Sequence, residues 1–119
     1  MSDNPLTQRK CAPCEGHAAP MSEMEARGFL KMTPLWELDE SGKSISRTYR
    51  MKNFMAAVDF IGQVAGIAED EDHHPDLHLT GYRNLRIVLS THAIGGLSEN
   101  DFIVAAKVGE LAPDLKGEN

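Results

Sequence analysis

The spacing of the hydrophobic residues changes twice in the middle of this chain. Residues 45–51 alternate between hydrophobic and polar side chains, which is typical of a strand. In residues 54–68 the hydrophobic side chains recur every three or four positions, which predicts an amphipathic helix of about four turns. Residues 77–80 and 85–90 then alternate again. The sequence therefore predicts a strand, a helix and two further strands, in this order.

Local signals on both sides extend this pattern. Ser22 and Glu25 have the spacing of a capping box, which predicts the start of a short helix that ends before Pro34. Residues 35–38 alternate as a further strand, and Ser98 is the expected N-cap of a last helix. The predicted order is α-β-β-α-β-β-α. This order indicates an α+β fold, with an antiparallel four-stranded sheet and helices on one face.

A chain of 119 residues with 41% hydrophobic content suits one domain. Residues 1–20 are polar, contain prolines and show no hydrophobic period, so we expect a flexible N-terminal tail. The folded domain is expected at residues 21–112, followed by a polar C-terminal tail at residues 113–119.

The formal net charge of −6 argues against a broad surface for nucleic acid or an anionic membrane, because such surfaces need clustered Lys and Arg. No hydrophobic run approaches the roughly 20 residues that span a bilayer, and the N-terminus lacks the hydrophobic centre of a signal peptide. We therefore expect a cytoplasmic protein with no membrane and no nucleic-acid partner.

The candidate chemistry lies in residues 69–101, where a run of four acids at 69–72 is followed by four histidines. Three of these histidines are the candidates for the site: His73, His74 and His92. Histidine is the side chain whose ordinary pKa, about 6.5, lets it give and take protons near neutral pH. Held on a rigid frame, His73, His74 and His92 are suited to acid/base chemistry on a neutral heterocycle.

Five separated positions follow one another at set intervals: Glu69, the triplet His73-His74-Pro75, Tyr82, His92 and Asp101. The neighbouring residues read Leu-Ser-Thr-His at 89–92 and Gly-Leu-Ser-Glu-Asn-Asp at 96–101. This order and these intervals resemble the signature of the pterin-4a-carbinolamine dehydratase family, with weaker similarity at Trp36, Tyr49, Phe54 and Phe60. The resemblance covers roughly residues 22–111, and a Cys-x-x-Cys-Glu-Gly opening at residues 11–16 is similar to that of some plant and bacterial members.

The resemblance implies the same α+β topology and a hydro-lyase. Its substrate would be 4a-hydroxytetrahydrobiopterin, which loses water to give the quinonoid dihydropterin, with the pterin as substrate and no cofactor. It also implies that His73, His74 and His92 line the pterin pocket as catalytic residues. Our hypothesis makes His74 and His92 the proton-transfer pair and His73 mainly a binding residue.

The remaining signature residues are expected to bind substrate or to orient the imidazoles. Glu69 and Asp72 are candidate partners for imidazole N–H groups, since a carboxylate beside the ring fixes its tautomer. Asp101 has either this role or only that of a helix cap. Three further residues are assigned to the site: Pro75 fixes the backbone that presents the two adjacent histidines, Tyr82 is either part of the pocket wall or a sheet aromatic, and Thr91 precedes His92. His78 is expected to be an exposed strand residue.

A metal site is the first alternative. Cys11, Cys14 and His17 offer at most three ligands, whereas a structural zinc site needs four, so we expect no metal. The second alternative is a catalytically inactive chaperone, because pterin dehydratase-like proteins include assembly factors for RuBisCO. RuBisCO subunits would then be the partners.

A homodimer or homotetramer is expected under either function. Short antiparallel strands leave sheet edges that pairing between subunits covers. The last helix carries Phe102, Ile103 and Val108 around more of its circumference than one buried face requires. The family resemblance implies dimers or tetramers as well.

Overall fold

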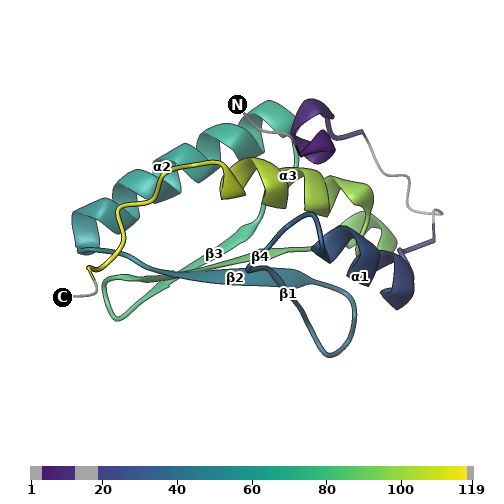
Figure 1. Ribbon diagram of the computed structural model, residues 1–119, viewed down its shortest axis with the longest axis horizontal. Helices are drawn as coiled ribbons and strands as arrows, with labels where there is room; N and C mark the ends of the chain where they lie inside the picture. Colours follow the sequence, from purple (N-terminus) through teal and green to yellow (C-terminus); the bar gives the residue numbers. More distant parts are fainter. Residues whose placement is uncertain (1–3, 13–18, 118–119) are drawn as a thin grey trace.

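A four-stranded antiparallel sheet forms one layer of the molecule, and the computed structural model describes residues 4–12 and 19–117 (Figure 1). The strand order is β1-β2-β4-β3, so the two hairpins meet where β2 pairs with β4. The strands are β1 (Glu37–Leu38), β2 (Ile45–Arg50), β3 (Asp76–Thr80) and β4 (Asn84–Leu89). The predicted α+β class and element order are confirmed.

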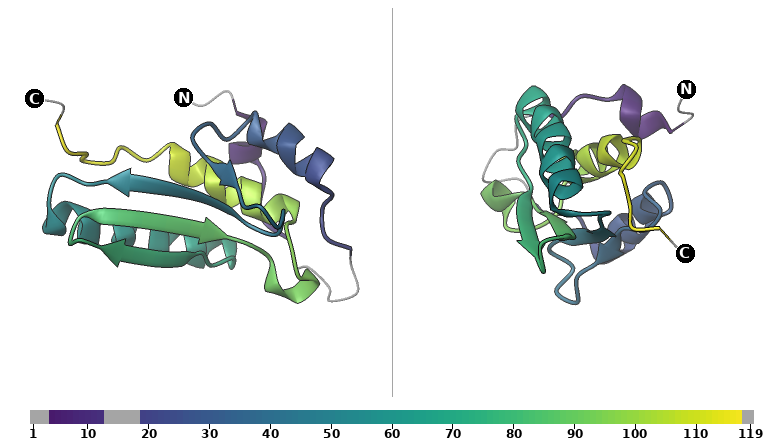
Figure 2. Two further views of the ribbon diagram at one scale, coloured as in Figure 1. Left: turned by 90° about the horizontal axis from the view of Figure 1, so that it is seen from below. Right: turned by 90° about the vertical axis from the view of Figure 1, so that its left-hand side faces the viewer.

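The second layer consists of helices α2 (Phe54–Glu71) and α3 (Glu99–Gly109), which cover one face of the sheet (Figures 1 and 2). Helix α1 (Glu23–Leu30) packs near β1. It begins at Ser22 with the predicted capping box: Ser22 N donates to Glu25 Oε1 at 3.1 Å, and Glu25 N donates to Ser22 Oγ at 3.2 Å. None of the helices in the described residues is long and apolar enough to cross a bilayer.

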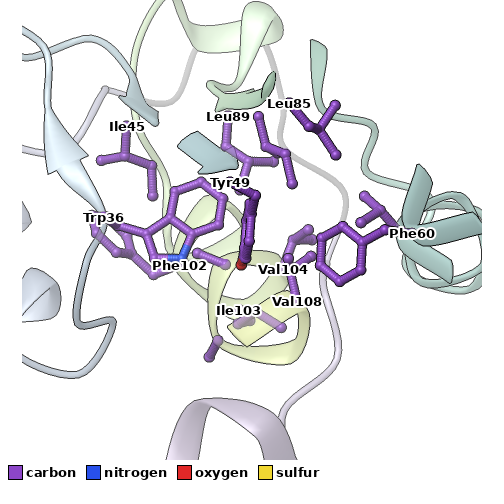
Figure 3. Close-up of a cluster of buried hydrophobic side chains, with 14 of the residues drawn as sticks. Trp36, Ile45, Tyr49, Phe60, Leu85, Leu89, Phe102, Ile103, Val104 and Val108 are labelled. Carbon is purple, nitrogen blue, oxygen red and sulfur yellow. The ribbon is translucent and has the colours of Figure 1, made fainter. Parts of the chain in front are cut away.

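The hydrophobic core lies between the two layers. Figure 3 shows Tyr49 of β2 beside Phe60 of α2, with ring centroids 4.8 Å apart. Phe102 of α3 stacks on Phe29 of α1 at 5.2 Å, which joins the first helix to the core. The first contact joins the sheet to α2, and the second joins α1 to α3.

The N-terminal segment departs from the prediction of a flexible tail. Residues 5–8 form a 3-10 helix, η1 (Pro5–Gln8), which lies on the side of α3 away from the sheet (Figure 1). Its Leu6 is fully buried, and Asn4 Nδ2 donates to Met32 O at 2.6 Å. One leucine in a polar segment produces no hydrophobic period, so the sequence pattern does not reveal its burial.

This packing also changes the interpretation of α3. Ile103 is only 2% exposed, and η1 packs on this helix within the same chain. The hydrophobic circumference of α3 is thus covered by the N-terminal segment, and it no longer supports contact with another subunit. At the other end of the chain, residues 114–116 hydrogen-bond to residues 50–52 beyond the end of β2.

Helix α2 continues beyond the predicted residues 54–68 and includes three of the four acids at 69–72. It stops at Asp72, whose backbone is left-handed with φ 52°. Its buried face contains Phe60, Val64, Ala68 and Glu71, whereas Phe54, which the sequence placed on that face, is half exposed.

Candidate active site

A cavity of about 410 Å³ lies where the C-terminal end of α2 meets the N-terminal end of α3. The β3–β4 hairpin brings two walls of the cavity together. Because Asp76 pairs with Val88, the residues before β3 and those after β4 lie at the same end of the sheet. The cavity is lined by Cys11, Ala12, Glu71, Asp72, His73, His74, Ser90, Thr91, His92, Ala93 and Asn100. The structure therefore brings all three predicted histidines to one cavity.

His73 is held by a buried carboxylate. Its Nε2 lies 2.7 Å from Asp101 Oδ1, and the Asp101 side chain is completely buried. An ionised carboxylate only accepts hydrogen bonds, so a neutral His73 ring that faces one has its proton on Nε2 and a lone pair on Nδ1. His73 is thus fixed in orientation and tautomer, with its side chain 12% exposed at the cavity.

Asp101 combines the two roles that the sequence left open. Its Oδ2 accepts hydrogen bonds from Ser98 N at 3.0 Å and from Thr91 Oγ1 at 2.8 Å, while Oδ1 faces His73. The bond from Ser98 N caps α3, and the contact with His73 orients the imidazole. Thr91 supports the carboxylate and also lines the cavity, so it acts on His73 through Asp101.

His74 has a more exposed environment. Its Nε2 lies 2.5 Å from Glu69 Oε2, and both side chains are more than half exposed. Glu69 is on the last turn of α2, and His73 and His74 follow the helix end at Asp72, before a trans peptide at Pro75. The turn therefore presents adjacent histidines to two different carboxylates.

His92 begins the short 3-10 helix η2 (His92–Ile94), which follows β4. Gly95 ends η2 in the left-handed region at φ 68°, and Thr91 then pairs with Gly96 in an isolated bridge. This tight loop holds His92 at the cavity wall. Within the described residues its ring makes no hydrogen bond, so both nitrogens are available to a ligand.

Two predicted site residues lie differently from the expectation. Tyr82 lies in the turn between β3 and β4, at the opposite end of this hairpin from His73, and it is 59% exposed under Arg83. It does not line the cavity of this chain. Asp72 does line the cavity, but its observed role is the left-handed cap of α2 rather than a hydrogen bond to an imidazole.

Glu71 is a residue of the site that the sequence analysis missed. Its side chain is 1% exposed, and its Oε2 lies 2.5 Å from Lys107 Nζ. Burial raises the pKa of this carboxyl, but the hydrogen bonds from Lys107 and from the Cys11 amide outweigh burial and leave the pKa below its ordinary value. The helical period contained the signal, because Glu71 continues the buried row of Val64 and Ala68.

The N-terminal segment supplies a second missed part of the site. Cys11 and Ala12 line the cavity beside Asn100 of α3. Burial and the neighbouring charge of Glu71 raise the pKa of the Cys11 thiol to about 12, so it stays protonated at neutral pH. Nothing in the local pattern of residues 4–12 indicates this placement, since it depends on contacts with α2 and α3.

The Cys-x-x-Cys hypothesis concerns Cys14 and His17, which lie outside the described residues. Among residues 4–12 and 19–117, no group of three or more His, Cys, Asp or Glu side chains is arranged to hold a metal ion. The titratable groups that line the cavity are imidazoles, carboxylates and the protonated thiol of Cys11. Such groups exchange protons with a bound molecule and orient it through hydrogen bonds.

The fold and this site define the class as a small α+β protein with a histidine–carboxylate cavity. The family model for pterin 4 alpha carbinolamine dehydratase matches residues 19–111. "Pterin-4-alpha-carbinolamine dehydratase 2, mitochondrial" of Arabidopsis thaliana is 47% identical over 109 residues, which cover 89% of this chain and 58% of that protein. The chain belongs to the pterin-4a-carbinolamine dehydratase family, which places it among the hydro-lyases.

Two further comparisons agree with this assignment. A Methylococcus capsulatus protein, "Putative pterin-4-alpha-carbinolamine dehydratase", is 45% identical and is matched over 92% of this chain and 95% of its own length. The crystal structure of a transcriptional coactivator/pterin dehydratase from Brucella melitensis superposes with a TM-score of 0.69 at 30% identity, covering 75% of this chain and 94% of that one. This chain therefore spans most of the length of these two bacterial relatives, but only about three fifths of the length of the Arabidopsis protein.

Proposed function

We propose that this protein catalyses the dehydration of a 4a-hydroxytetrahydropterin to the quinonoid dihydropterin. The observation that carries the proposal is the meeting of three imidazoles at one cavity, with His73 fixed by the buried Asp101. The reaction breaks the bond between C4a and its hydroxyl oxygen. It needs an acid that protonates this hydroxyl and a base that accepts the proton of the adjacent ring nitrogen.

His74 and His92 are our candidates for the proton-transfer pair. Both are exposed at the cavity, so they exchange protons with substrate and then with solvent. The Glu69 carboxylate at 2.5 Å orients the His74 ring at the cavity. Catalysis by such positioned groups contributes about 10²- to 10⁴-fold.

His73 is our candidate for substrate binding. Because Asp101 holds its Nε2–H, the Nδ1 lone pair is left to accept a hydrogen bond from an N–H of the pterin. A ring that is fixed in one tautomer binds and orients the heterocycle, and the exposed histidines then act on the reacting atoms.

The direct test is the purified protein with freshly generated 4a-hydroxytetrahydropterin, without added metal or nucleotide. We expect the dehydration to be faster than the spontaneous reaction, and the rate to be proportional to protein concentration. If folded protein gives no acceleration, the proposal is wrong and the RuBisCO assembly-factor hypothesis takes precedence.

A homodimer or homotetramer is part of this proposal. The edge strand β3 is short and lies at the margin of the sheet, where pairing with another subunit would satisfy its outer backbone groups.

A further inference from the structure

The N-terminal arm, defined here as residues 9–12, reaches the cavity although it lies outside the segment that the family model matches. That match begins at residue 19, whereas Cys11 and Ala12 form part of the cavity wall. The wall that they form faces the end of α2 and the first turn of α3. The segment that the family model matches therefore includes the histidines of the site but not Cys11 and Ala12.

Two hydrogen bonds of the Asn100 side chain hold the arm against α3. The Asn100 Oδ1 atom accepts a hydrogen bond from Ala12 N at 3.0 Å, and Asn100 Nδ2 donates to Ala12 O at 2.6 Å. The side-chain amide thus pairs with both backbone groups of one residue, as a neighbouring strand would. Because Asn100 is 8% exposed, this pairing is shielded from water.

A hydrogen bond to the Glu71 side chain holds the arm against α2. Its Oε1 accepts a hydrogen bond from Cys11 N at 2.8 Å, while Oε2 is bound by Lys107 of α3. The same carboxylate therefore joins α2, α3 and the arm. The ion pair between Arg9 and Glu99 at 2.7 Å is exposed, so its contribution is small.

We propose that the arm is a specificity-determining wall of the pterin pocket, with Asn100 and Glu71 as the residues that position it. This inference rests on the proposed function of the cavity. The wall presents a small methyl group at Ala12 and a thiol at Cys11, so it limits the size of the ligand without filling the cavity. Within the described residues, none of the arm's hydrogen bonds reaches an imidazole, so the arm acts on binding and not on proton transfer.

Two variants test the wall: one releases the arm, and the other adds a bulky side chain to it. Asn100→Ala removes both bonds to Ala12 and should release the arm, so that trypsin cleaves after Arg9 and Lys10 about tenfold faster. Ala12→Phe keeps the arm in place but extends a ring into the cavity, so the cleavage rate should not change. We expect KM for the 4a-hydroxytetrahydropterin to rise in both variants, with kcat unchanged.

Each variant has a matched control. Glu99→Gln breaks only the exposed ion pair of Arg9, and it should leave tryptic cleavage and KM as in the wild type. Gln8→Phe places the same ring on an exposed position of η1 that does not line the cavity, and it should not affect KM. Ala12 is exposed, so Ala12→Phe still decides the question if Asn100→Ala fails to fold.

Binding of 7,8-dihydropterin, which lacks the 4a-hydroxyl, separates this inference from the proposed function. A weaker Kd in both variants supports the wall even if the wild type shows no turnover. An unchanged KM and Kd in Ala12→Phe, or a lower kcat at unchanged KM in both variants, would overturn the inference. Accelerated cleavage of Asn100→Ala without any change in Kd would show that Asn100 holds the arm for stability alone, and it would also overturn the inference.

Discussion

The histidines of the site differ in what holds them, and the division of tasks that we propose rests on this difference. His73 faces a carboxylate with no exposed surface, whereas the His74–Glu69 pair is open to solvent and His92 has no partner within the described residues. A buried, hydrogen-bonded pair is suited to orientation, and an exposed imidazole is suited to proton exchange.

Replacing either proton-transfer candidate should remove activity but preserve the fold. We expect His74→Ala and His92→Ala each to lower kcat by about 10²-fold or more, because one acid or base is lost. Both side chains are exposed, so the melting temperature should change little. Rate measurements with thermal denaturation of the same samples check this prediction.

His78→Ala is the matched control for this pair. His78 is exposed on β3, opposite Arg86 of β4, and does not line the cavity. It should keep wild-type activity. Wild-type rates in His74→Ala and His92→Ala would exclude these imidazoles as the catalysts.

Glu71 should make stability dependent on pH. Its folded-state pKa lies below the ordinary value of 4.5, so its carboxylate stabilises the fold above about pH 4.5, and this stabilisation is lost as the pH falls through the folded-state pKa. We expect Glu71→Gln to lower the free energy of unfolding by about 1–3 kcal/mol at pH 7, and by progressively less below pH 4.5. Urea denaturation at several pH values measures the difference.

The exposed Glu99→Gln variant provides the comparison for Glu71. Its loss should be about 0.5 kcal/mol or less, since its pair with Arg9 is solvent-exposed. If the Glu71→Gln difference stayed constant down to pH 3, the ion pair with Lys107 would not be its source.

At the scale of elements, the C-terminal end of α2 has an unusual composition. Glu69, Asp70 and Glu71 occupy its last turn, where acids interact unfavourably with the helix dipole. Each of them has a cationic or imidazole partner from elsewhere: His74, Lys10 and Lys107. The helix therefore continues through the acidic run because tertiary contacts compensate for the local cost.

We expect Asp72 to act as the C-cap of α2 and not as a substrate-binding residue. Its φ of 52° favours glycine, so Asp72→Gly should raise the free energy of unfolding by up to about 1 kcal/mol. Asp72→Val should lower it by about 1–2 kcal/mol, because a β-branched side chain is strained in this region. Urea denaturation of both variants measures these changes. A large loss of activity in Asp72→Gly would instead support the orienting role that the sequence suggested.

At the scale of the whole molecule, α2 leaves a hydrophobic group uncovered. Phe54, Met55 and Val58 are 50%, 62% and 39% exposed near the start of this helix. We expect this surface and the β3 edge to take part in the dimer or tetramer. Light scattering should give an oligomeric mass for the wild type at micromolar concentration, and Met55→Glu should reduce that mass.

Gln63→Glu adds the same charge to an exposed polar position of α2 and should keep the oligomer. A monomeric wild type at micromolar concentration would contradict the expected assembly. An oligomer that persists in Met55→Glu would place the contact elsewhere, with the β3 edge as the next candidate.

The sequence by itself determined the elements and their caps. Residues 54–68 carry a helical period and residues 45–51 a strand period, and the hydrogen bonds of Ser22 with Glu25 are local. It also named Glu69 as a candidate partner for an imidazole, and Glu69 lies beside His74, five positions along the chain. These features depend on residues a few positions apart, where backbone geometry alone sets the contacts.

Only the tertiary structure decided the rest. The pairing of β2 with β4, the burial of Glu71 against Lys107 and the docking of Leu6 on α3 join residues that are at least 30 positions apart. Local periodicity carries no information about such contacts, because many partners satisfy the same hydrophobic pattern. The particular partner depends on how the whole core packs, and this packing brings the N-terminal arm to the cavity.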